Sequence, residues 1–157
     1  MENPQEKFMK RAIRLSIENI EKGGGPFGAV IVKNGEIIAE SANSVAIDND
    51  PTAHAEINAI RIAAKKLQTF DLSGCEIYSS CEPCPMCLGA IYWAKIDKLY
   101  YGNTKSDADK IGFSDNFIYE EFEKNITQRN LKTEQILKNE AIEAFKKWEK
   151  YEDKIEY

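Results

Sequence analysis

The clustering of the cysteines, together with a single histidine, constrains this chain more than any other feature of its sequence. All four cysteines lie between Cys75 and Cys87, and His54 is the only histidine among the 157 residues. A disulfide framework spreads its cysteines so that they close long loops, whereas a tight cluster favours metal or redox chemistry. Cys84 and Cys87 can reach one metal ion, but two thiolates cannot complete a tetrahedral site, so we expect His54 to be the third ligand.

Both parts of this ligand set lie at predicted helix starts. His54 follows Asp50-Pro51-Thr52, which begins one helix, and Cys84 opens another, whose N-terminus lowers the pKa of nearby thiols. Three protein ligands leave the fourth position of a zinc ion open to water, which marks a catalytic zinc. Zinc lowers the pKa of a bound water to about 7, so hydroxide becomes available near neutral pH. We expect one zinc per chain.

Glu56 is the candidate for acid–base chemistry at this site. Residues two apart do not share a helix face, so its carboxylate should lie beside the metal that His54 binds, and not on it. From there the carboxylate can take a proton from water and deliver it to a substrate nitrogen. The combined pattern predicts a zinc-dependent aminohydrolase.

Each part of the pattern also has a simpler interpretation. A Cys-x-x-Cys alone is most often a structural zinc half-site or a redox pair, and a lone histidine is most often a helix cap or a core residue. The spacing of Cys81, Cys84 and Cys87 also mimics part of an iron–sulfur motif, but no cysteine follows to complete it. We interpret Cys75 and Cys81 as small buried apolar residues.

The hydrophobic pattern predicts a layered α/β fold. Asn3 is a plausible N-cap for a first helix, and Asn34-Gly35 is a strong hairpin signal. The order helix, strand, strand, helix, strand, helix, strand calls for a sheet with helices on its faces. After the first helix the predicted elements are strands Gly28–Lys33 and Glu36–Ser41, a helix from Asp50, strand Gly74–Ser80, helix Met86–Lys95, strand Asp97–Gly102, helix Ser106–Ile111, a strand at Leu131–Leu137 and a helix from Asn139.

Helical periodicity also predicts which residues face inward. In the first helix these are Phe8, Met9, Ala12, Ile13, Ile17 and Ile20. In the later helices they are Ile57, Ile60, Ala64 and Leu67, then Leu88, Ile91 and Tyr92, and finally Ile142, Phe145, Trp148 and Tyr151.

Composition narrows the class of protein. With 43% hydrophobic residues the chain can bury a sizeable core, which excludes a wholly disordered polypeptide. The net charge of −5 disfavours nucleic acid as a partner. No apolar stretch approaches the roughly 20 residues that a bilayer crossing needs, and no apolar signal segment is visible at the N-terminus. We therefore expect one cytoplasmic domain, residues 1–157, with no membrane partner.

The sequence resembles the zinc-dependent nucleobase deaminases, whose signature is His-x-Glu followed by Pro-Cys-x-x-Cys. Here it stands as His54-Ala55-Glu56 and Pro83-Cys84-Pro85-Met86-Cys87. The stretches Gly24–Val32, Ser80–Ala94 and Gly112–Tyr119, with the terminal Glu156-Tyr157, resemble the small bacterial guanine deaminases within that superfamily. The resemblance implies a three-layer α/β/α cytidine deaminase-like fold with a mixed central sheet of about five strands. It also implies conversion of guanine to xanthine and ammonia.

The same resemblance implies a set of substrate-binding residues and a homodimer. Asn43 would bind the purine ring, Phe27 would stack near the base, and Asp115 would accept hydrogen bonds from the purine edge. Trp93 would line the pocket. Asp115 and Tyr157 would both close the pocket of the partner subunit. The C-terminal segment, about 112–157, would be exchanged with a partner subunit.

Three other functions fit part of the pattern. The tRNA adenosine deaminases share the stretch Asp50–Glu56, but acids outnumber bases from Ile118 to Tyr157, and reading a tRNA loop needs a basic surface. Deaminases of other nucleobases or nucleosides would have the same zinc site. A non-catalytic zinc-binding domain would leave Glu56 without a role.

Overall fold

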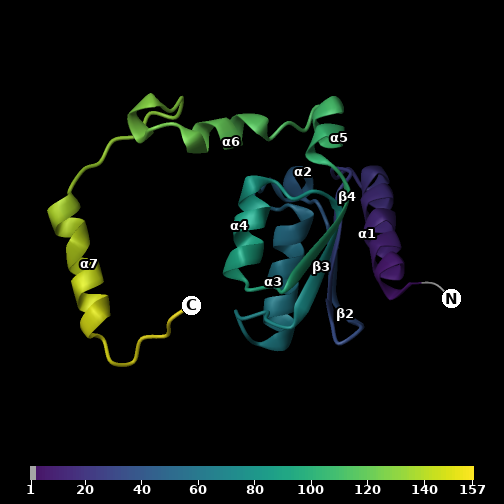
Figure 1. The fold of residues 1–157 in the computed structure, drawn as a ribbon, viewed down its shortest axis with the longest axis horizontal. Helices are drawn as coiled ribbons and strands as arrows, with labels where there is room; N and C mark the ends of the chain where they lie inside the picture. The colour runs from purple at the N-terminus through teal and green to yellow at the C-terminus, as the bar shows by residue number, and fades with distance from the viewer. Residues whose placement is uncertain (1–2) are drawn as a thin grey trace. The chain divides into compact units, whose positions relative to one another are not determined.

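The computed structural model describes residues 3–157, which divide into two compact units with the boundary along the chain after Asp115 (Figure 1). The first unit contains the sheet, and the second, Asn116–Tyr157, contains helices only. The elements of the first are α1 (Pro4–Glu21), β1 (Gly28–Lys33), β2 (Glu36–Ala42), α2 (Val45–Asp48), α3 (Ala55–Leu67), β3 (Cys75–Cys81), α4 (Pro85–Trp93), β4 (Lys98–Asn103) and α5 (Lys105–Lys110). Those of the second are α6 (Asn116–Glu123), the 3-10 helix η1 (Ile126–Gln128) and α7 (Lys138–Lys150).

Local sequence signals set several of these boundaries. The Asn3 side chain caps α1 by accepting a hydrogen bond of 3.1 Å from the backbone N–H of Gln5, and Pro4 occupies the first turn. Asn34 and Gly35 both have positive φ, 52° and 79°, as a tight hairpin turn between β1 and β2 requires. The predicted helix start and hairpin are confirmed.

The sheet has four strands in the order β2-β1-β3-β4, so the expected number of about five is one too high. β1 pairs antiparallel with β2 and with β3, whereas β3 and β4 are parallel. The extra strand was expected at Leu131–Leu137, but that segment forms no strand. A short segment becomes a strand only where a neighbouring strand offers its backbone groups, and the local sequence cannot supply that partner.

Strand direction brings distant parts of the chain to one edge of the sheet. Because β2 and β3 both run antiparallel to β1, they are parallel to each other and to β4. Their carboxyl ends therefore share one edge, which is also where β1 begins. The loops that follow β2, β3 and β4 and the loop before β1 all emerge there, and in parallel sheets such an edge is the usual place for a binding site.

Helices cover both faces of the sheet and create a three-layer α/β/α arrangement, as expected (Figure 1). α1 packs on one face, while α3 packs on the other with α4 beside it. β1 divides its side chains between the two faces. Ala29 and Ile31 join the core under α3, and Val30 and Val32 join the smaller core under α1 with Phe8, Ala12 and Tyr78.

The buried faces of the helices differ from those that apolar spacing predicts. On α1, Phe8 and Ala12 are buried as expected, but Ile13, Ile17 and Ile20 are exposed. The buried face of α1 continues instead through Ser16 and Asn19, because this part of the helix meets the backbone of the site loops. On α3 the small residues Ala59 and Ala63 are fully buried and Ile57 is half-buried, while Ile60, Ala64 and Leu67 pack half-buried against the core as expected. On α4 Ile91 is buried as expected, whereas Tyr92 is exposed.

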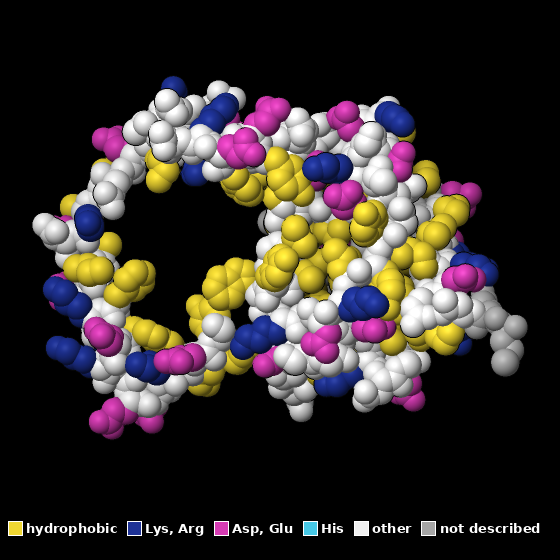
Figure 2. Space-filling view, viewed as in Figure 1, with side chains coloured by type: hydrophobic (Ala, Val, Ile, Leu, Met, Phe, Trp, Pro, Cys, Tyr) yellow, Lys and Arg dark blue, Asp and Glu magenta, His cyan; other side chains and the backbone are white. Residues whose placement is uncertain are grey.

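The second unit contains no buried residue. Its apolar side chains lie at the surface, including the predicted stripe of α7, and Figure 2 shows hydrophobic side chains exposed along this segment. The stripe consists of Ile142, Phe145, Trp148 and Tyr151. Among the described residues, no helix combines the length and apolarity that a membrane crossing requires.

The close approach of α1 to β1 at Gly28 leads to a prediction about stability. A Cβ atom at Gly28 would lie 2.3 Å from the carbonyl oxygen of Ala12 and 2.8 Å from the backbone nitrogen of Ser16, and backbone cannot move aside. We expect Gly28→Ala to lower the free energy of unfolding by about 1–3 kcal/mol in urea denaturation.

Gly89→Ala is the matched control, because a Cβ at this helical glycine would meet nothing within 4 Å. It should leave stability unchanged or raise it by up to about 1 kcal/mol. Equal stability of the two variants would contradict the tight α1–β1 packing.

Candidate active site

His54 stands at the N-terminus of α3 with its imidazole turned away from the helix. It is the N-cap residue in extended conformation, and its carbonyl oxygen accepts the backbone N–H of Asn58 at 2.9 Å. Its side chain makes no capping hydrogen bond and is half-buried. His54 thus occupies the cap position, but its side chain does not cap the helix, and the imidazole is available as a ligand.

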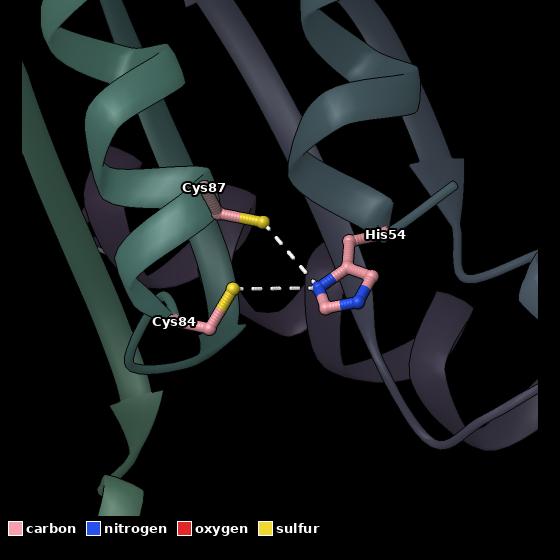
Figure 3. A group of neighbouring side chains, drawn as sticks. All are labelled: His54, Cys84 and Cys87. Carbon is pink, nitrogen blue, oxygen red and sulfur yellow. Dashed lines mark hydrogen bonds between the residues drawn. The ribbon is translucent and has the colours of Figure 1, made fainter. Parts of the chain in front are cut away.

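Cys84 and Cys87 occupy the N-terminus of α4, directly after β3. Cys84 is the N-cap, Pro85 starts the helix, and Cys87 is buried in the first turn. Both sulfurs point to the same nitrogen of His54, as Figure 3 shows: the distance from Nδ1 is 3.6 Å to the Sγ of Cys84 and 3.5 Å to the Sγ of Cys87. The fold thus brings together the three predicted ligands.

The geometry of this group fits a zinc ion. Its three ligand atoms all lie within 4.8 Å of one another. Ligands at the usual zinc distances of about 2.0–2.3 Å and at tetrahedral angles lie roughly 3.5–3.8 Å apart, which matches the two sulfur–nitrogen distances. Two thiolates and one imidazole also form a soft donor set that suits zinc.

Electrostatics within the group favours a thiolate at Cys84. The pKa of the Cys84 thiol falls to about 4, chiefly because its sulfur accepts a hydrogen bond from Cys87 and a further one from His54. The hydrogen bond with Cys84 in turn raises the pKa of His54. Burial has the opposite effect on the two other cysteines: it raises the pKa of Cys81 to about 11 and raises that of Cys75. These two remain buried thiols outside the ligand group.

Glu56 lies in the first turn of α3 and is buried, with 6% of its surface exposed. Its Oε1 lies 2.8 Å from the hydroxyl of Ser79, and that hydroxyl lies 2.7 Å from the carbonyl oxygen of Cys81. Burial raises the pKa of Glu56, and hydrogen bonds from its own backbone and from Ser79 oppose that rise. The carboxylate is outside the group of converging ligand atoms.

Asn43 and Phe27 lie beside each other at the same edge of the sheet. The backbone N–H of Asn43 donates to the carbonyl oxygen of Phe27 at 3.0 Å. The Asn43 side chain is buried, and its Oδ1 accepts the N–H of Val45 at 3.2 Å, which leaves the amide nitrogen for a ligand. The ring of Phe27 is half-buried and meets Phe113 edge to face, with 5.0 Å between centroids.

The other predicted substrate residues, Asp115, Trp93 and Tyr157, are more exposed than Asn43. Asp115 is half-buried at the end of the first unit, and its pKa is raised, first by burial and then by the charge of Cys84. Trp93 is the last residue of α4 and is 68% exposed. Tyr157 belongs to the second unit and is 74% exposed.

Sequence reasoning missed three polar residues that support the site: Asn19, Asn58 and Ser79. One signal was present for Asn19: it lies seven residues, about two helical turns, after Ala12 and is therefore a polar residue on the face that Phe8 and Ala12 begin. No comparable signal marks Asn58 or Ser79, because their partners come from other elements of the fold.

The ligand geometry predicts how zinc content depends on the individual cysteines. Cys84→Ala removes one of three protein ligands, so we expect a nearly complete loss of zinc after dialysis against a mild chelator, measured by elemental analysis. Cys81→Ala removes a buried thiol outside the group and should keep one zinc per chain. Equal zinc content in the two variants would overturn the assignment of the ligands.

Three comparisons relate the chain to known proteins. A guanine deaminase of Bacillus subtilis (strain 168) is 50% identical over 153 residues, which cover 97% of this chain and 98% of that protein. The X-ray structure of guanine deaminase from Bacillus subtilis matches with a TM-score of 0.95 at 49% identity, covering 100% of this chain and 99% of that chain. A tRNA-specific adenosine deaminase of Aquifex aeolicus (strain VF5) is 47% identical over 97 residues, 62% of this chain and 64% of that protein.

The matching protein family agrees with the geometry of the site. Residues 2–103 match the family described as the cytidine and deoxycytidylate deaminase zinc-binding region. This range contains the converging ligands His54, Cys84 and Cys87 and the buried Glu56 beside them. The chain belongs to the cytidine and deoxycytidylate deaminase zinc-binding family, and it is a hydrolytic deaminase with a site for one zinc ion.

Proposed function

We propose that this protein hydrolyses guanine to xanthine and ammonia. The observation that carries this proposal is the 50% identity to a guanine deaminase along 97% of the chain, including the second unit. The tRNA-specific adenosine deaminases combine identity and coverage less well, with 47% identity over 62% of the chain in one and 40% over 85% in another. The acidic balance of the chain, a net charge of −5, also disfavours an RNA substrate. All four cysteines are unpaired thiols, which fits a reducing compartment, and we place the enzyme in the cytoplasm.

Glu56 is the group that moves protons in this reaction. The overall change adds one water to guanine and releases one ammonia, so two protons must leave the water: one reaches a ring nitrogen and the other reaches the departing amine. Zinc, when bound to His54, Cys84 and Cys87, supplies Lewis-acid activation of water near neutral pH. A buried carboxylate whose pKa is raised is suited to both accept and donate the proton.

Ser79 allows Glu56 to change its protonation state without losing its hydrogen bond. A hydroxyl group has one proton and can also accept. When Glu56 is ionised, Ser79 donates to its Oε1; when Glu56 is protonated, Ser79 can accept from it and donate to the carbonyl oxygen of Cys81. The carboxyl group thus keeps one position through the proton transfers.

Three residues at the same edge of the sheet have the chemistry to bind a purine base. The Asn43 amide nitrogen can donate to the guanine carbonyl, and Phe27 offers an aromatic ring for stacking. The carboxylate of Asp115 can accept hydrogen bonds from the N–H groups of the purine edge. The influence of the Cys84 charge on Asp115 supports its placement near the metal ligands.

The second unit supports a homodimer in which this segment is exchanged. Residues 116–157 bury no side chain, although α7 carries the apolar stripe of an ordinary core helix. Such a segment is stable only when its apolar face is covered, and a second copy of the chain can provide the cover. In this arrangement Tyr157 closes the pocket of the partner subunit. The exposed Trp93 of the partner subunit lines that same pocket. The ring contact of Phe113 with Phe27 supports an exchange that begins after Asp115, later than the expected start at about residue 112. With this later start Asp115 acts in the pocket of its own chain.

Ammonia release tests the proposed function directly. We expect guanine to be turned over much faster than guanosine, adenine, cytosine or cytidine, with xanthine as the product.

Glu56→Gln tests the role of the carboxylate. It cannot accept a proton, so it should keep the zinc and the fold while the rate falls by about 10²–10⁴-fold or more. Preferred turnover of another substrate would overturn the assignment of guanine, and a loss below tenfold would assign Glu56 to structure.

Mixed dimers test the exchange. If Tyr157 acts in the partner's pocket, co-expression of Glu56→Gln and Tyr157→Ala chains yields heterodimers in which one pocket carries both changes and the other neither. Activity should then exceed that of either variant alone. Co-expression of Glu56→Gln with Asp115→Ala should give no such recovery, because both residues act in the pocket of their own chain. If a purified heterodimer of the Glu56→Gln and Tyr157→Ala chains recovered no activity, the exchange would be refuted.

A further inference from the structure

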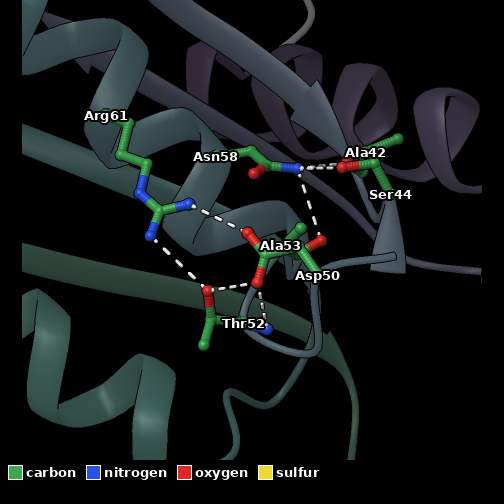
Figure 4. Close-up of polar contacts among 7 residues, drawn as sticks. All are labelled: Ala42, Ser44, Asp50, Thr52, Ala53, Asn58 and Arg61. Atoms are coloured by element: carbon green, nitrogen blue, oxygen red, sulfur yellow. Dashed lines mark hydrogen bonds and ion pairs between the residues drawn. The ribbon is translucent and has the colours of Figure 1, made fainter. Parts of the chain in front are cut away.

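The side chain of Asn58 connects two loops of the site. It lies on α3, one turn after His54, and Figure 4 shows its amide nitrogen facing three oxygen atoms of the loops. These are the carbonyl oxygen of Ala42 at 3.1 Å, the hydroxyl of Ser44 at 3.0 Å and the carbonyl oxygen of Ala53 at 3.3 Å. Two of these acceptors flank Asn43 and the third directly precedes His54. One amide group therefore joins the residues on both sides of Asn43 to the residue before a metal ligand.

Asn19 holds the same segment from the opposite side. This buried residue near the end of α1 donates through its amide nitrogen to the carbonyl oxygen of Asn43 at 2.7 Å and to that of Gly25 at 2.8 Å. A Cβ at Gly24 would lie 2.2 Å from that nitrogen and 2.6 Å from the Asn43 oxygen. The hydrogen bond between Asn19 and Asn43 therefore leaves no room for a side chain at Gly24.

Backbone hydrogen bonds complete this arrangement. The N–H of Ser44 donates to the carbonyl oxygen of Ala53 at 2.9 Å, parallel to the link that Asn58 makes. The backbone of Asn43 is thus held by side chains of α1 and α3 and by the loop that carries His54, while its own amide nitrogen is left for a ligand.

We propose that Asn58 is a positioning residue for base recognition: it fixes the distance between Asn43 and the His54 loop, with Asn19 as its counterpart on the other side. The inference rests on the proposed function, in which Asn43 binds the purine while the metal site activates water. Asn43 and the metal site must then be held at a fixed distance from each other, because a misplacement of about 1 Å can lower the rate on the order of 10²-fold.

Arg61 is a matched control on the outer side of the same loop. Its guanidinium lies 3.6 Å from the carboxylate of Asp50 and 3.5 Å from the hydroxyl of Thr52, and both contacts are exposed (Figure 4). Asp50 also accepts two hydrogen bonds from Thr52 that do not need Arg61. Arg61→Ala therefore removes side-chain contacts from this loop and leaves its link to Asn43 intact.

A double-mutant cycle in the zinc-loaded full chain tests whether Asn58 acts through Asn43. Well below the unfolding temperature, we expect Asn58→Ala to lower kcat/KM for guanine at least tenfold with one zinc retained. In an Asn43→Ala background the same change should cost less than threefold, because the residue it positions is gone. Arg61→Ala should stay within twofold of the wild type. Equal losses of activity from Asn58→Ala in both backgrounds would overturn the proposal.

Binding and hydrogen exchange give readouts that do not depend on turnover. In a Glu56→Gln background, Asn58→Ala should raise the Kd of guanine at least tenfold. Amide exchange at Asn43 and Ser44 should accelerate at least tenfold in Asn58→Ala and remain unchanged in Arg61→Ala. Unchanged exchange at these amides would refute the positioning role even if guanine proved not to be the substrate, whereas failure of the wild type on guanine alone would refute the proposed function.

Ser44→Ala provides a milder variant if Asn58→Ala does not fold. It removes one of the three acceptors and leaves both carbonyl oxygens in place. We expect a two- to fivefold loss of kcat/KM that again disappears in the Asn43→Ala background. A loss that persists there would contradict the proposal.

Discussion

The active site depends on a constraint of strand direction. β1 pairs antiparallel with both β2 and β3, which forces those two strands to be parallel and to end at the same edge of the sheet. α3 and α4 follow them, so the two helix N-termini that carry His54 and Cys84 emerge together. A reversal of either strand would move one ligand to the far end of the sheet. The local conformation of the ligands is set by helix starts, but their meeting is set by the sheet.

Polar groups around the site are held by specific partners. Among residues 3–157, every buried side-chain nitrogen or oxygen has a hydrogen-bond partner. Glu56 is supported by Ser79, and the Asn43 segment by Asn19 and Asn58. Burial makes such groups costly when they are left unpaired, so the same contacts that stabilise the loops also restrict them to one arrangement. Stability and positioning come from the same interactions here.

The two units differ in how far they bury their apolar side chains. The first places apolar side chains on both faces of one sheet and covers each face with helices. The second has an amphipathic helix but buries none of its residues. A helix of this kind gains most of its stability from packing, so the segment needs a surface beyond its own residues. In the proposed dimer a second copy of the chain supplies that surface.

The sequence by itself determined the chemistry of the site and most of the secondary structure. The soft ligands His54, Cys84 and Cys87, the position of Glu56 outside this ligand group and the Asn34-Gly35 hairpin follow from residue type and short spacing, which are local properties. The absence of a strand at Leu131–Leu137 did not follow from the local sequence, because strand pairing needs a partner that a short segment does not specify. Only the tertiary structure decided that Asn19 and Asn58 hold the Asn43 loop while Ile17 and Ile20 are exposed. Which face of a helix is buried depends on what packs against it, and that neighbour comes from a distant part of the chain.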